Sequence, residues 1–170
     1  KLLAEGAPVN ATDERGRTAL MAATHADRPD IVQALLQAGA DVNIRDARSD
    51  NPFLYAGAQG QLSSVRLAIG VRACPRLTNG LGGTALIRAA ERGFPTIIDR
   101  LLDAGIQVDH VNELGWTALH EAVILGKGTE PYVRVVQQLL DAGADAMLPS
   151  QRDGVRPIEH ARQRGFTEIV

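Results

Sequence analysis

The chain repeats itself with a period of 33 residues. Related segments begin with DERGRTALMAA at Asp13, DARSDNPFLYAG at Asp46, NGLGGTALIRAA at Asn79 and NELGWTALHEAV at Asn112. A second segment follows in several copies, as VQALLQAGADVN over 32–43, IDRLLDAGIQVD over 98–109 and VQQLLDAGADAM over 136–147. Such a period indicates that each copy is one small structural unit, which buries its apolar face by stacking on its neighbours.

The period divides the chain into a single repeat domain over 1–170. We assign a partial copy to 1–12, full copies to 13–45, 46–78, 79–111 and 112–150, and a partial copy to 151–170. Because 1–12 contain only the second half of a copy and Val170 falls within the second helix of another, we expect the natural array to extend further on at least one side.

Signals for two helices recur within each copy. Thr18, Thr84 and Thr117 stand where a side-chain oxygen can cap a first helix. Prolines suit the opening turns of helices, at Pro52 and Pro157 in first helices and Pro29 and Pro95 in second helices. Leucine pairs give the second helices an apolar face, and glycines follow at the left-handed C-terminal position, at Gly6, Gly39, Gly105 and Gly143.

The G-x-T-x-L-x-x-A half and the L-L-x-x-G-A-D-V-N half together resemble the ankyrin repeat, and the resemblance covers the whole chain. It implies an all-α repeat solenoid, in which each copy is a hairpin or turn followed by two antiparallel helices. It further implies a concave side lined by hairpin tips and first helices, and a convex side formed by second helices.

Composition excludes several classes of function. The net charge of −2 and the six aromatic residues give no basic face for nucleic acid. No apolar run approaches the length of a membrane span, and Cys74 has no partner for an intramolecular disulfide. Of 18 basic residues only Lys1 and Lys127 are lysine, which favours a GC-rich, bacterial genome. The cytoplasm is slightly favoured, with the periplasm or export open if a signal precedes Lys1.

One stretch, GWTALHEAVILG over 115–126, resembles the start of the zinc-protease motif H-E-x-x-H. The motif needs a second histidine four residues after His120, and that position is Ile124, so we predict no metal site. The family resemblance instead gives His120 a structural hydrogen-bonding role. NGLGGT over 79–84 lacks the lysine of a phosphate-binding loop, and Cys74 has no evident base nearby in sequence, so we also predict no cofactor and no catalytic residue.

Two copies depart from the pattern. Copy two has Ala68-Ile69 in place of the leucine pair and Arg72 in place of the glycine. Sequence drift is favoured there over a partner-specific surface around Arg72, Cys74 and Arg76. Copy four carries five extra residues, KGTEP over 127–131, and a further one near Ser150. A solvated spacer with a displaced helix start at Thr129 and Pro131 is favoured over a functional loop.

Five apolar residues fall at positions that the family exposes over its groove. We predict that they form one exposed patch across copies three and four: Trp116, Leu114, Leu81, Ile124 and Leu125. The alternative is that Trp116 folds onto its neighbours. Further candidate partner-binding residues are Arg15, Arg17, His25, Arg48 and Arg92.

These features predict a non-catalytic scaffold that binds a protein partner through the concave groove. The alternative is a regulatory or targeting module of a larger chain whose enzyme or effector domain lies outside 1–170. We expect a monomer unless exposed repeat ends pair, with no nucleic-acid partner and no membrane segment.

Overall fold

The computed structural model describes residues 6–170. Within that range the chain forms nine helices: α1 (Ala19–His25), α2 (Pro29–Gln37), α3 (Pro52–Gln59), α4 (Leu62–Gly70), α5 (Ala85–Arg92), α6 (Pro95–Asp103), α7 (Ala118–Ile124), α8 (Glu130–Asp141) and α9 (Pro157–Gln163). The nine helices confirm the expected all-α solenoid. None of them is long and apolar enough to cross a membrane.

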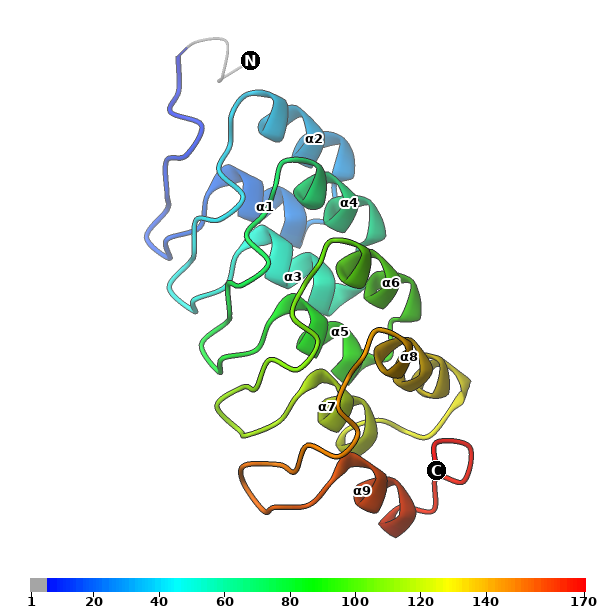
Figure 1. The fold of residues 1–170 in the computed structure, drawn as a ribbon. Coiled ribbons are helices and arrows are strands. Elements are labelled where there is room, and N and C mark those ends of the chain that lie inside the picture. Colours follow the sequence, from blue (N-terminus) through cyan, green and yellow to red (C-terminus); the bar gives the residue numbers. More distant parts are fainter. Residues whose placement is uncertain (1–5) are drawn as a thin grey trace.

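Figure 1 shows the helices stacked in two rows, with hairpin loops projecting to one side. The first helices α1, α3, α5, α7 and α9 form the inner row, and the second helices α2, α4, α6 and α8 form the outer row. The core runs between the rows, where large apolar side chains such as Phe53, Ile98 and Leu139 are fully buried.

Capping residues begin the first helices where the sequence predicts. The hydroxyls of Thr18, Thr84 and Thr117 accept backbone N–H groups of the first turn, and Asn51 does the same for α3. Asn51 is fully buried, so copy two keeps its helix start although its sequence is degenerate. Close packing of the inner row depends on small residues, because a Cβ at Gly57 of α3 would lie 3.2 Å from the Cβ of Ala85 in α5.

Arg72 is the strained residue of copy two. It has φ of 60°, whereas glycines occupy the same left-handed turn after α2, α6 and α8. A side chain in this region costs roughly 1 kcal/mol relative to glycine. Copy two therefore keeps the left-handed turn although it has lost the glycine.

The insertion in copy four lengthens a helix and packs against the end of the chain. Thr129 is the N-cap residue of α8 and Pro131 lies in its first turn, as the sequence predicts. α8 has 12 residues, against 9 in α6. A Cβ at Gly128 would lie 2.5 Å from the Phe166 ring, and the guanidinium of Arg164 donates to the carbonyl of Gly126. Apart from half-buried Gly128, the inserted residues are exposed, so the insertion is largely the solvated spacer that the sequence favours, with one contact to the end of the chain.

The last copy is shorter than expected. Residues 167–169 form a turn after α9, so the second helix predicted there is not formed. The partial copy assigned to 1–12 is described only from Gly6, which has the expected positive φ of 84°; residues 1–5 lie outside the described range.

Candidate functional site

The hairpin loops are tied to one another along the stack. The Ala47 N–H donates to the Arg15 carbonyl at 2.9 Å, and the Glu113 N–H donates to the Leu81 carbonyl at 3.0 Å. Within each hairpin an Asp or Asn side chain accepts backbone N–H groups, as Asn112 does from Leu114 and Trp116, each at 3.0 Å. We call the surface where these loops meet the inner row of helices the groove face.

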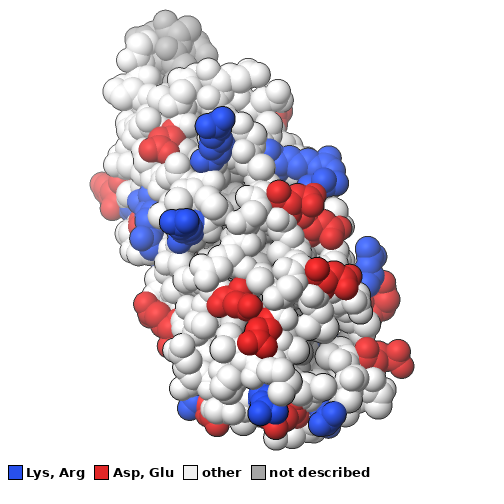
Figure 2. Space-filling model, viewed as in Figure 1, with Lys and Arg blue, Asp and Glu red and all other residues white. Residues whose placement is uncertain are grey.

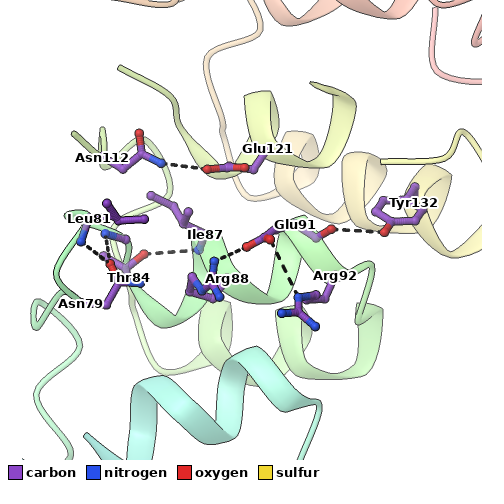
Figure 3. Close-up of polar contacts among 11 residues, drawn as sticks. Asn79, Leu81, Thr84, Ile87, Arg88, Glu91, Arg92, Asn112, Glu121 and Tyr132 are labelled. Atoms are coloured by element: carbon purple, nitrogen blue, oxygen red, sulfur yellow. Dashed lines mark hydrogen bonds and ion pairs between the residues drawn. The ribbon is translucent and has the colours of Figure 1, made fainter. Parts of the chain in front are cut away.

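A pocket of about 160 Å³ opens on the groove face between copies three and four. The hairpins contribute Asn79, Leu81, Gly83, Asn112 and Leu114 to its lining. Helices α5 and α7 contribute Ile87, Arg88, Glu91 and Glu121, and Leu125 follows the end of α7. Figure 3 shows Asn112 and Glu121 on one side of this space, with Leu81, Ile87, Arg88 and Glu91 on the other. We call it the α5–α7 pocket.

The pocket brings together three of the five residues of the predicted apolar patch. Leu81 and Leu125 are 55% and 47% exposed, and Leu114 is half-buried. All three line the pocket, together with the buried Ile87. The pocket is therefore apolar over much of its wall while remaining open to solvent.

The predicted exposure of Trp116 is wrong. The indole is only 9% exposed, and the Arg152 guanidinium of the next hairpin lies over the ring, 5.8 Å from its centre. The next hairpin also approaches the adjacent backbone closely, because the Gln151 N–H donates to the Gly115 carbonyl at 3.0 Å. Trp116 therefore packs within the stack, as in the alternative weighed for it. Its role in partner binding stays a prediction.

Ile124 does not join the other patch residues either. It is half-buried and absent from the pocket lining, and its carbonyl accepts a hydrogen bond from Arg164 at the end of the chain. The contiguous five-residue patch is thus reduced to three leucines.

The five other candidate residues are spread along the stack. Arg17 pairs with Asp13 at 2.7 Å, and the His25 ring stacks on Tyr55 of α3 with centroids 4.1 Å apart. Arg15 and Arg48 are exposed in the first two hairpins, and exposed Arg92 lies 3.8 Å from Glu91. The structure does not gather them at the α5–α7 pocket. Figure 2 shows positive and negative side chains interspersed over the face in view.

Glu121 is the unusual group of the pocket. It is 4% exposed, and its Oε1 accepts from Asn112 Nδ2 at 2.8 Å. Burial, and next the nearby Glu91 carboxylate, raise the pKa of Glu121 to about 7, against the opposing effects of Asn112 and Arg88. Arg88 itself pairs with Glu91. Among the described residues, the second oxygen of Glu121 has no hydrogen-bond partner.

His120, beside it, serves the fold. Its Nδ1 lies 2.9 Å from the Thr117 hydroxyl and accepts the Thr117 N–H at 3.3 Å, which completes a capping box at the start of α7. Burial lowers the pKa of His120. The predicted structural hydrogen-bonding role is confirmed. Residues 6–170 contain no group of three or more potential metal ligands.

Sequence reasoning missed the polar residues of the pocket. Glu121 was considered only beside His120 as part of a metal motif, and Arg88 and Asn112 were not singled out. Aligning the copies supplies the signal, because Tyr55, Arg88 and Glu121 occupy one position at 33-residue intervals. A position that varies in this way between copies is free to face the groove.

Comparison with known proteins agrees with this architecture. A family model described as ankyrin repeats (3 copies) matches residues 53–150, and one described as ankyrin repeat matches 15–47. The chain belongs to the ankyrin repeat family. Its members are generally protein–protein interaction modules, and the family and the fold are those of scaffolds.

Two bacterial relatives match nearly the whole chain. The ankyrin repeat protein YahD of Escherichia coli (strain K12) is 37% identical over 169 residues, covering 99% of this chain and 84% of YahD. A solved ankyrin repeat domain from Acinetobacter baumannii AYE is 49% identical with a TM-score of 0.95, covering 99% of this chain and 85% of that one. The human mitochondrial disaggregase is 35% identical over 175 residues, and this ankyrin array spans 23% of its length.

Proposed function

We propose that this chain is a non-catalytic scaffold that binds a protein partner through its groove face. The observation that carries the proposal is the α5–α7 pocket, where exposed Leu81 and Leu125 stand on a frame whose hairpins and helices are held by internal hydrogen bonds. Exposed apolar residues gathered on a rigid concave frame favour interaction with another protein.

Partner capture by groove variants tests this proposal. Tagged protein is used to capture partners from a native extract, and the capture is repeated with Leu81→Arg and with Leu125→Arg. Both residues are exposed, so the variants should fold, while a charge in the pocket should weaken partner binding by about 2 kcal/mol or more. Ile31→Arg is the matched control, because Ile31 is 39% exposed on the outer helix α2.

The result expected is loss of the same captured protein with both groove variants and its retention with the control. Equal capture by all four proteins would reject the groove face as the binding surface. Loss with Ile31→Arg alone would assign binding to the outer row.

A second candidate follows from the disaggregase relationship. A homologous array can form part of a much longer chain, since this segment matches 23% of that protein. The array would then regulate or target a domain encoded next to it, and the same groove face would contact that domain. Sequencing the gene on both sides of this segment distinguishes an accessory module from a scaffold without a further domain.

A further inference from the structure

The α5–α7 pocket contains one polar atom that the fold leaves unused. Glu121 is only 4% exposed, and its Oε2 has no hydrogen-bond partner among the described residues. A buried carboxylate oxygen without a partner is costly, so a ligand that supplies a donor gains from satisfying it.

The neighbouring polar groups are directed at other partners. Asn112 donates its amide to Oε1 of Glu121, and its own oxygen is held by the N–H groups of Leu114 and Trp116. Arg88, the nearest cation in the lining, is paired with Glu91. The Asn112 bond orients the Glu121 carboxyl group, and no described group donates to its Oε2.

The charge and the walls of the pocket select a particular kind of guest. The lining contains two carboxyl groups, Glu91 and Glu121, and one guanidinium, Arg88. The pocket therefore has an excess of negative charge when Glu121 is ionised. Leu81, Leu114 and Leu125 form the apolar wall. An anionic guest would be repelled, and a wholly apolar guest would leave the Glu121 oxygen buried without a donor. A guest with an alkyl stem and a cationic head can pack its stem against the apolar wall and donate from its head to the Glu121 oxygen.

We propose that the α5–α7 pocket receives one lysine or arginine side chain of the protein partner, with the stem against the leucines and the charged head on Oε2 of Glu121. This inference rests on the proposed function, since it names the side chain that the groove face recognises. At about 160 Å³ the pocket has room for a side chain but not for a helix.

Recognition of this kind depends on pH. The Glu121 pKa of about 7 reflects burial and Glu91, and binding a cation requires the ionised form. The other groups acting on Glu121 are Asn112, which donates to its Oε1, and Arg88 on α5. On α8, Tyr132 donates its hydroxyl to the Glu91 carbonyl. Substitution of Glu121 isolates its contribution to this pH dependence.

The test uses small mimics of the two side chains and therefore needs no partner. The backbone amides of the isotope-labelled protein are followed by NMR during titration with n-butylammonium and with n-butylguanidinium up to about 50 mM. n-Pentanol serves as the neutral control and butyrate as the anionic one. Glu121→Gln removes the acceptor charge, and Glu113→Gln is the charge-matched control, since Glu113 is exposed in the adjacent hairpin.

At pH 8 both cations should shift the amides of Leu81, Gly83, Leu114 and Leu125 saturably, with millimolar Kd. Glu121→Gln should weaken this binding about fivefold or more, and Glu113→Gln less than twofold. Between pH 8 and pH 6 the affinity of the unsubstituted protein should fall about tenfold, as Glu121 becomes protonated, whereas Glu121→Gln should change little.

Equal binding of pentanol, unchanged affinity in Glu121→Gln, or no saturable shift of these amides by either cation would overturn the inference. Each of these results leaves the proposed function standing, because partner capture by the leucine variants is measured separately. The opposite case is that both leucine variants capture the partner as well as the unsubstituted protein does, while the cations still bind at the pocket. It would retain the pocket chemistry and reject the groove as the partner's surface.

Discussion

At the scale of single residues, buried polar groups in this protein divide into those that the fold satisfies and those that it does not. Asn51 Oδ1 caps α3 and His120 Nδ1 belongs to the cap of α7, whereas Asn51 Nδ2 and His120 Nε2 have no hydrogen-bond partner among the described residues. Glu121, next to His120 on α7, is buried with one oxygen unpartnered. The two helix caps stabilise the fold, whereas the unpartnered oxygen of Glu121 costs stability whenever the carboxyl group is ionised.

Glu121 should therefore make the protein less stable as pH rises. Its folded pKa of about 7 lies above the ordinary value of 4.5, so the folded state holds the proton more tightly. This stabilisation is fully present below pH 4.5 and is lost as pH rises through 7. Glu121→Gln should raise the free energy of unfolding at pH 8 by up to about 3 kcal/mol, and change it little at pH 4.5. Urea denaturation of both proteins at pH 8 and pH 4.5 measures this change in unfolding free energy. An equal difference between the two proteins at the two pH values would contradict the prediction.

Trp116 should now behave as a core residue. Its indole is 9% exposed and lies beneath Arg152, so Trp116→Ala should lower the free energy of unfolding by about 3 kcal/mol. Trp116→Phe, which keeps most of the ring, should lose clearly less. A loss under about 0.5 kcal/mol for the alanine variant, the size typical of an exposed site, would show that the ring is not packed.

At the scale of the repeat, the joint between copies two and three lacks a bond that other joints have. The side chain of Asn10 accepts the N–H of Asp41, Asn43 accepts that of Cys74, and Asp109 accepts that of Asp145. The residue at this position in copy two is Arg76, and a guanidinium has no acceptor. Together with the positive φ of Arg72, this leads us to expect that copy two is the weakest internal unit.

Native-state hydrogen exchange should therefore show the helices of 46–78 opening before those of 79–111. Arg76→Asn should restore an acceptor for the Gln107 N–H and slow the opening, by about 1 kcal/mol of opening free energy. Arg66→Asn, on the exposed side of α4, controls for the lost charge. The reverse order of opening would contradict the assignment of copy two as the weak unit.

At the scale of the whole molecule, what could be predicted from sequence is what is set locally or by the period. Thr18, Thr84 and Thr117 cap helices by accepting the backbone N–H three residues further along the chain, so the sequence of a single copy suffices to predict these caps. The burial of Trp116 depends on Arg152 of the following copy, whose position follows from three-dimensional stacking. The packing of the insertion on Phe166 escaped prediction for the same reason.

In the proposed complex, the protein partner occupies the groove face at copies three and four. Hydrogen exchange of the protein, free and bound to the partner that it captures, tests this most directly. We expect slower exchange in the hairpins and inner helices over 79–92 and 112–125 when the partner is bound, with the outer helices α2, α4 and α6 unchanged. Protection confined to those outer helices would contradict it.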